Sequence, residues 1–142
     1  MIQGRAQSLP EHRSAQKLIL IVEDDAVNAD CLASIISQET PHHVFVVKNS
    51  LRALQFVTHI KPQLFILDYR LPDMNALELY DRLHADRDLR DVPALILSAW
   101  VECYQDDIKA RKLCSLGKPF ELDELLSTIE NLLASSPGEQ AV

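Results

Sequence analysis

Five short apolar runs alternate along the chain with five segments whose apolar residues recur at helical spacing. The apolar runs, which predict β-strands, lie at residues 17–23, 43–48, 63–68, 93–98 and 114–117. The predicted helices lie at residues 26–39, 50–60, 75–86, 102–113 and 121–135. Strands that alternate with helices over short connections form βαβ units, so the pattern predicts an α/β fold with a parallel sheet and helices on both faces. The runs also lack period-two alternation, as expected of strands that are covered on both sides.

The first two predicted helices carry local signals of their own. A stripe of five apolar residues along the first helix is expected to face the core: Val27, Cys31, Leu32, Ile35 and Ile36. Asp25 and Ser50 are the expected N-caps of these helices, because their side-chain oxygens can accept hydrogen bonds from the first free backbone N–H groups.

The composition is that of one globular domain. The chain has 142 residues, of which 47% are apolar, enough to bury a core. Its longest apolar runs have four or five residues, whereas a membrane-spanning helix needs roughly 20. We expect the folded domain to span residues 17–134, with flexible tails at 1–16 and 135–142.

Charge and residue types limit the classes of partner. The net charge of −7 disfavours nucleic acid as a direct partner, because phosphate binding needs a basic stripe. Residues 1–16 contain no apolar signal-peptide core, so we expect a cytoplasmic protein without a membrane partner. Three cysteines without a CxxC pair favour reduced thiols. His42 and His43 lack metal-ligand spacing and are predicted to form the exposed start of a strand.

Polar residues follow several of the predicted strands at their carboxyl ends. Glu23 and Asp24 follow the first strand, and Asp68 ends the third. Ser98 ends the fourth strand, and Lys118 follows the fifth. In an open parallel sheet the carboxyl ends of the strands lie at one edge, where ligands bind. Each residue taken singly has an ordinary explanation as a cap or loop residue, but their joint placement predicts a shared site.

The residue types in this set indicate phosphoryl chemistry. Carboxylates a few ångströms apart repel and raise one another's pKa. A hard divalent cation relieves this repulsion, and Mg²⁺ binds one or two carboxylates together with waters and phosphate oxygens. Asp68 would be both a metal ligand and a nucleophile that can form an acyl phosphate. Lys118 and the Ser98 hydroxyl would bind the remaining phosphoryl oxygens.

Four stretches resemble the receiver domain of two-component response regulators: LILIVEDD, LFILDYRLPDMNALEL, DVPALILSA and LGKPFELDELL. The likeness implies a flavodoxin-like, doubly wound parallel sheet with strand order 2-1-3-4-5 and five helices. The residues that match the family's acidic pair, phospho-acceptor, hydroxyl and lysine are Glu23, Asp24, Asp68, Ser98 and Lys118. The likeness also implies a Mg²⁺ ligand from the backbone carbonyl of Arg70 and a cis peptide bond before Pro119.

The chain departs from the family pattern near the fifth strand. Ser115 stands three positions before Lys118, where the family usually has an aromatic switch residue. We hypothesise that Trp100 partly replaces this aromatic side chain as a mobile reporter. The interval from Ser98 to Lys118 is also shorter than usual, which indicates a reshaped surface around the fourth helix and fifth strand and an unusual partner.

The expected function is that of a stand-alone response regulator in a phosphorelay. Asp68 would accept a phosphoryl group from the phosphohistidine of a histidine kinase or a histidine phosphotransfer protein. The domain would catalyse only its own phosphorylation and dephosphorylation, and is otherwise not an enzyme. About seven residues follow the last helix, so output is expected through contact of the fourth helix, fifth strand and fifth helix with a downstream protein.

Three alternatives are less favoured. The first is a phosphorylation-independent interaction module, or pseudo-receiver, on the same fold, which Ser115 favours and the intact acidic set opposes. The second is a hydrolase of the haloacid dehalogenase type, whose chemistry requires an acidic residue two positions after the nucleophile, where this chain has Arg70. The third is a nucleotide-binding protein. With only three glycines, Gly4, Gly117 and Gly138, neither GxxxxGK nor GxGxxG is present.

Overall fold

The computed structural model describes residues 16–99, 105–111 and 113–134, which form one parallel sheet between two layers of helices. The strands are β2 (Leu18–Val22), β3 (His43–Val47), β4 (Leu64–Asp68), β5 (Ala94–Ser98) and β6 (Cys114–Gly117). They lie in the order β3-β2-β4-β5-β6, and every neighbouring pair is parallel. Counted along the chain this order is 2-1-3-4-5, so the predicted topology is confirmed. Of the predicted tails at 1–16 and 135–142, residues 1–15 and 135–142 lie outside the described residues.

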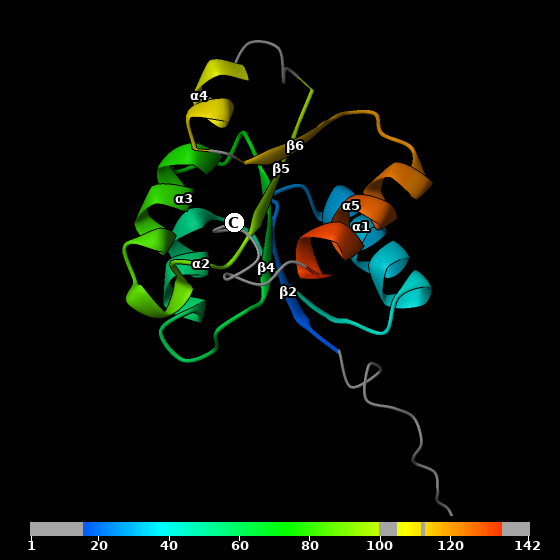
Figure 1. Ribbon diagram of the computed structural model, residues 1–142, viewed down its shortest axis with the longest axis horizontal. Helices are drawn as coiled ribbons and strands as arrows, with labels where there is room; N and C mark the ends of the chain where they lie inside the picture. Colours follow the sequence, from blue (N-terminus) through cyan, green and yellow to red (C-terminus); the bar gives the residue numbers. More distant parts are fainter. Residues whose placement is uncertain (1–15, 100–104, 112, 135–142) are drawn as a thin grey trace, which may run out of the picture.

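Helices cover both faces of the sheet. They are α1 (Ala26–Glu39), α2 (Ser50–Phe56), α3 (Ala76–His84), the 3₁₀ turn η2 (Arg87–Leu89), α4 (Gln105–Ala110) and α5 (Leu122–Ala134). Figure 1 shows α2, α3 and α4 on one side of the sheet, and α1 and α5 on the other. All five predicted helices are present, and α2 ends four residues before its predicted limit. None of the described helices combines the length and the apolar content that a membrane span requires.

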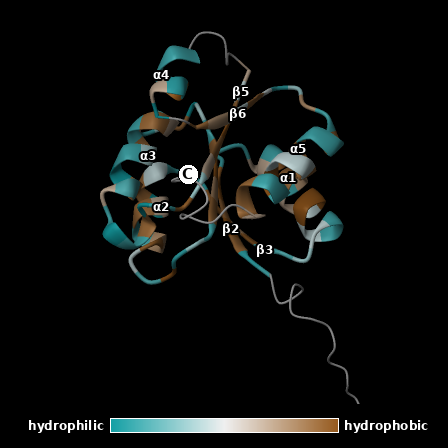
Figure 2. Ribbon diagram, in the orientation of Figure 1, coloured by the Kyte–Doolittle hydropathy of each residue, from teal (hydrophilic) through white to brown (hydrophobic). Residues whose placement is uncertain are grey.

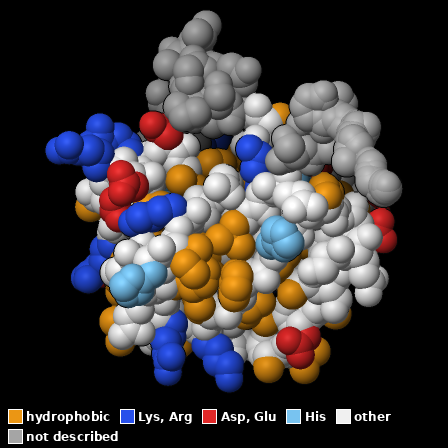
Figure 3. Space-filling model, turned by 90° about the horizontal axis from the view of Figure 1, so that it is seen from below, with side chains coloured by type: hydrophobic (Ala, Val, Ile, Leu, Met, Phe, Trp, Pro, Cys, Tyr) orange, Lys and Arg blue, Asp and Glu red, His pale blue; other side chains and the backbone are white. Residues whose placement is uncertain are grey.

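The core has one half on each face of the sheet. Figure 2 shows hydrophobic residues along the strands and on the helix surfaces that face them. In the central strand β4, Phe65 and Leu67 pack towards α2 and α3, while Leu64 and Ile66 pack towards α1 and α5. All four side chains are fully buried, which explains why this run shows no alternation of apolar and polar residues. Some apolar side chains remain outside the core, and Figure 3 shows a group of them exposed on the lower face.

The predicted core stripe of α1 is partly wrong. The residues of α1 that are buried are Ala29, Leu32 and Ile36. Val27 is 74% exposed, and Cys31 is also exposed. Ala29, Leu32 and Ile36 are spaced by three and four residues, so they form a competing stripe with the same period. The small side chain of Ala29 can face the sheet, and the helix is rotated so that Val27 and Cys31 point away from it.

The N-cap of α1 is confirmed, and that of α2 is displaced by one residue. The Asp25 carboxylate accepts the backbone N–H of Asn28 at 2.9 Å. In α2 the cap is Asn49, whose side-chain oxygen accepts the N–H of Arg52 at 2.8 Å. Ser50 is the first helical residue and is buried.

His42 is buried, contrary to the prediction, whereas the neighbouring His43 is exposed. The Nδ1 atom of His42 accepts the N–H of Lys17 at 3.1 Å. Its Nε2 atom therefore carries the proton of the neutral ring and donates to Glu130 at 3.0 Å. Glu130 belongs to α5, 88 positions further along the chain, so no local pattern could have indicated this contact.

Candidate functional site

Three carboxylates meet at the carboxyl edge of the sheet. Glu23 and Asp24 follow β2, and Asp68 is the last residue of β4. These strands are neighbours, and Val22 pairs with Leu67 in the register, so the next residues, Glu23 and Asp68, come side by side. One carboxylate oxygen from each of the three residues lies within 4.8 Å of the others. The strand order therefore produces the acidic cluster that the sequence predicted.

Lys118 extends into this cluster from β6. Its ammonium nitrogen lies 2.8 Å from Oδ1 of Asp68 and 3.6 Å from Oε1 of Glu23. Because β5 separates β6 from β4, only a long side chain can cover this distance. The Lys118 backbone N–H donates to the carbonyl of Ser98 at 2.9 Å, and the Lys118–Pro119 peptide bond is cis, as the resemblance implied.

Ser98 and Arg70 lie beside the cluster. Ser98 ends β5 and is buried; Asp68 pairs with Leu97 in the register, so Ser98 lies one position beyond it at the same edge. Arg70 lies in the connection from β4 to α3, and its backbone forms an antiparallel bridge with Asn75. The roles of the Ser98 hydroxyl and the Arg70 carbonyl remain predictions.

The electrostatics of the cluster leave negative charge in excess. Burial raises the pKa of Glu23, and repulsion by Asp68 and Asp24 adds to it, while the Asp25 N–H and Lys118 act in the opposite direction. Burial lowers the pKa of Lys118, but its hydrogen bond to Asp68 and its attraction to both carboxylates outweigh burial and raise it. Lys118 is therefore a permanent cation at neutral pH. Within the described residues, the cluster holds three carboxylates, and the ammonium group of Lys118 pairs with two of them, Glu23 and Asp68.

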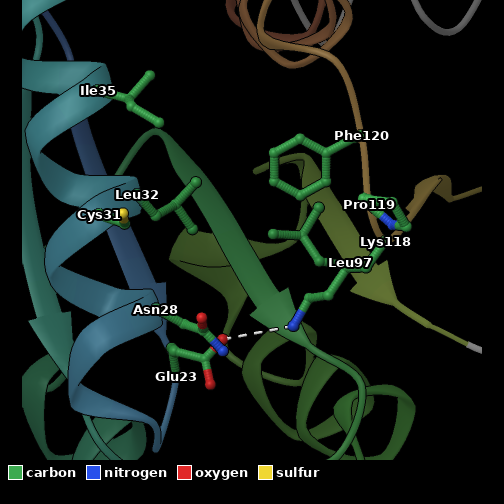
Figure 4. A pocket seen from close by; sticks show the side chains of 9 residues that line it. All are labelled: Glu23, Asn28, Cys31, Leu32, Ile35, Leu97, Lys118, Pro119 and Phe120. Carbon is green, nitrogen blue, oxygen red and sulfur yellow. Dashed lines mark ion pairs between the residues drawn. The ribbon is translucent and has the colours of Figure 1, made fainter.

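A groove of about 300 Å³ adjoins the cluster. Glu23, Asn28 and Lys118 line its polar end, and the side chains of Cys31, Leu32, Ile35 and Phe120 line the rest (Figure 4). It lies between α1 and the connection from β6 to α5. Sequence reasoning missed this groove because its walls come from segments that are far apart in the chain.

A model of the response regulator receiver domain family matches residues 19–130. The chain belongs to this family. Receiver domains are signalling modules of two-component systems, and histidine kinases or phosphotransfer proteins phosphorylate them. Sporulation initiation phosphotransferase F of Bacillus subtilis is 26% identical over 117 residues, which are 80% of this chain and 92% of that protein. Two other curated relatives are longer. The chain spans only 14% of a sensor histidine kinase and 58% of a transcriptional regulatory protein.

Solved structures show the same fold. A response regulator from Chloroflexus aurantiacus superimposes with a TM-score of 0.78 and 27% identity, over 84% of this chain and 99% of that chain. The receiver domain of the sensor histidine kinase PA1611 from Pseudomonas aeruginosa, solved with a magnesium ion in its active-site cleft, gives a TM-score of 0.77 at 22% identity. That alignment covers 84% of this chain and 99% of the PA1611 domain.

The structure describes Ser115 but not Trp100, the two residues for which the sequence predicted a departure from the family's switch. Ser115 lies on β6 opposite Ile96 of β5 and is partly buried. Trp100 lies outside the described residues, so its suggested role as a reporter stays a prediction.

Proposed function

We propose that this receiver domain is a phospho-acceptor in which Asp68 takes a phosphoryl group from a phosphohistidine. The observation that carries the proposal is the group formed by Glu23, Asp24 and Asp68 with Lys118 hydrogen-bonded to Asp68 at 2.8 Å. A carboxylate oxygen of Asp68 would attack the phosphorus, and the phosphorus–nitrogen bond would break as the oxygen–phosphorus bond forms. The histidine nitrogen leaves with the bonding electron pair, and the product is an acyl phosphate.

The donor set fits Mg²⁺. Three carboxylate oxygens within 4.8 Å of one another are the hard ligands that this ion prefers. Glu23, Asp24, Asp68 and the backbone carbonyl of Arg70 would hold it. When bound, Mg²⁺ neutralises charge on the phosphoryl oxygens during transfer. The magnesium ion in the PA1611 receiver domain supports this assignment.

Lys118 and Ser98 would stabilise the product. The Lys118 ammonium group contacts Asp68 directly. Once Asp68 is phosphorylated, Lys118 can pair instead with a phosphoryl oxygen, and its raised pKa keeps it charged. Ser98 lies at the same edge, where its hydroxyl can donate a hydrogen bond to another of these oxygens.

Partners would act by surface contact. The phosphohistidine would be presented by a histidine kinase or a histidine phosphotransfer protein, whose apolar side chains could occupy the groove beside Glu23 and Lys118. We further propose that the protein is a stand-alone regulator in the cytoplasm. Its output would pass through α4, β6 and α5 to a downstream protein, without direct contact to nucleic acid.

A second candidate function is a phosphorylation-independent interaction module. Ser115 favours it, because a small polar residue on β6 cannot fill the space of an aromatic switch. The two candidates differ in chemistry, so a chemical assay separates them.

The test is incubation with Mg²⁺ and acetyl phosphate, followed by intact mass spectrometry. A phosphoryl adduct is expected for the wild type and for Asp88→Asn, an exposed carboxylate before β5 at the opposite edge of the sheet. The adduct should be lost in Asp68→Asn. A wild type that forms no adduct and binds no Mg²⁺ would support the interaction module instead.

A further inference from the structure

The loop of residues 69–75 carries the chain from Asp68 to α3 and is tied to a neighbouring helix through Asp73. The Asp73 carboxylate accepts two backbone hydrogen bonds, Ser50 N–H to Oδ1 at 3.0 Å and Leu51 N–H to Oδ2 at 2.9 Å. Ser50 and Leu51 are the first two residues of α2. One carboxylate therefore satisfies two of the backbone donors that a helix leaves free at its start.

Other hydrogen bonds of this loop stay within it or join it to β5 and α3. Arg70 is bridged to Asn75, and the N–H of Ala76 donates to the Tyr69 carbonyl at 3.0 Å. The N–H of Tyr69 donates to Leu97 on β5 at 2.8 Å. The two hydrogen bonds to Asp73 join the loop to α2. Burial raises the pKa of Asp73, but hydrogen bonds, first those from the Leu51, Ser50 and Asp73 backbone N–H groups, outweigh it and lower the pKa. The carboxylate therefore still accepts these bonds at neutral pH.

We propose that Asp73 is a positioning residue for the metal site: its hydrogen bonds to the start of α2 hold the loop that carries Arg70. This inference rests on the proposed function, because it concerns the Mg²⁺ that the acidic cluster would bind. Arg70 is three residues from Asp73, and the Arg70–Asn75 bridge closes the loop around both. Loss of the tie at Asp73 therefore frees the backbone that would supply the Arg70 carbonyl.

Coupling of this kind is reciprocal. If the tie to α2 favours the loop geometry that binds Mg²⁺, then Mg²⁺ must strengthen the tie by the same factor. Bound Mg²⁺ should therefore slow hydrogen exchange of the Ser50 and Leu51 amides, which donate to Asp73. A carboxylate that only capped α2 would show no such response.

The chain offers a matched control. Asn49 caps the same helix by accepting the Arg52 N–H, a contact made within the first turn of α2 rather than with residues 69–75. Asp73→Ala and Asn49→Ala each remove a cap from α2, at similar expected cost to stability, yet only the first releases the loop. Asp73→Asn, which keeps one acceptor oxygen, serves if Asp73→Ala does not fold.

The experiment measures Mg²⁺ affinity by calorimetry and amide exchange by NMR. Asp73→Ala should raise the Mg²⁺ Kd by about 2- to 30-fold, with a smaller rise for Asp73→Asn and none for Asn49→Ala. In the wild type and in Asn49→Ala, Mg²⁺ should slow exchange at Ser50 and Leu51.

Three outcomes would overturn the inference. Equal effects of Asp73→Ala and Asn49→Ala on Mg²⁺ affinity, or Mg²⁺-independent exchange at Ser50 and Leu51 in the wild type, would reduce Asp73 to a helix cap and leave the proposed function standing. A wild type that binds no Mg²⁺ would remove the proposed function and this inference together.

Discussion

Replacing Lys118 with methionine removes a cation that two carboxylates share while keeping a side chain of similar length. The side chains of Glu23, Asp68 and Lys118 are 4%, 13% and 28% exposed. Removing one partner of a fully buried ion pair costs about 3–5 kcal/mol, and exposed pairs contribute about 0–1 kcal/mol. Because the lysine is partly exposed and the carboxylates are nearly buried, Lys118→Met should lower the free energy of unfolding by about 2–4 kcal/mol without Mg²⁺.

Addition of Mg²⁺ should reduce that difference. The ion would return positive charge to the carboxylates. Without the ammonium group that contacts Asp68 and Glu23, the variant should bind the ion with a lower Kd than the wild type and so gain more stability from it. The assay is urea unfolding followed by circular dichroism, with and without saturating Mg²⁺. Arg111→Met is the control. Arg111 donates two hydrogen bonds to Asp81 at 3.0 and 2.8 Å, but this pair is more exposed, so its loss should cost about 1 kcal/mol or less in both conditions.

Two results would refute the reasoning. Equal destabilisation by Lys118→Met and Arg111→Met without Mg²⁺ would mean that the lysine does not compensate buried charge. A difference between the wild type and Lys118→Met that Mg²⁺ leaves unchanged would mean that the ammonium group does not compete with an ion bound among these carboxylates.

Three further predictions concern the fold. His42→Ala should cost about 1–3 kcal/mol, because it leaves the partly buried N–H of Lys17 without its acceptor. His43→Ala should stay within about 0.5 kcal/mol, and urea unfolding that ranks the two variants equally would contradict this. The hydrogen bond from Arg111 lowers the pKa of Asp81 from its ordinary value of 3.8. The pair therefore stabilises the fold fully above pH 3.8, and its contribution is lost as the pH falls through the lowered pKa. Asp81→Asn should thus be less stable than wild type at neutral pH, with the gap in thermal unfolding closing in acid. Ile66→Ala, at a fully buried position, should cost about 2–5 kcal/mol in chemical denaturation; a loss below about 1 kcal/mol would be inconsistent with a rigid core.

The register of the sheet explains why sequence analysis located most of the candidate site. Parallel strands place their carboxyl ends at one edge, so residues that end neighbouring strands meet whatever the details of side-chain packing. Glu23 and Asp68 come together because β2 and β4 are neighbours in the sheet, a strand order that the family resemblance implied. Lys118 reaches Asp68 because its side chain is long enough to extend past β5.

The wrong predictions for the buried face of α1 and for His42 have a different origin. Two stripes of equal period compete on α1, and packing against the sheet selected the one with Ala29 rather than Val27. His42 is buried because α5 brings Glu130 to its ring. Neither outcome depends on neighbours in the chain.

The sequence by itself determined the order of strands and helices, the parallel sheet and the gathering of acidic residues at its edge, because these follow from hydrophobic period and strand ends. Only the tertiary structure decided which face each helix buries, the groove beside α1 and the tie from Asp73 to α2. These features depend on contacts between residues distant in the chain, such as Asp73 with Ser50, and local patterns carry no information about such contacts.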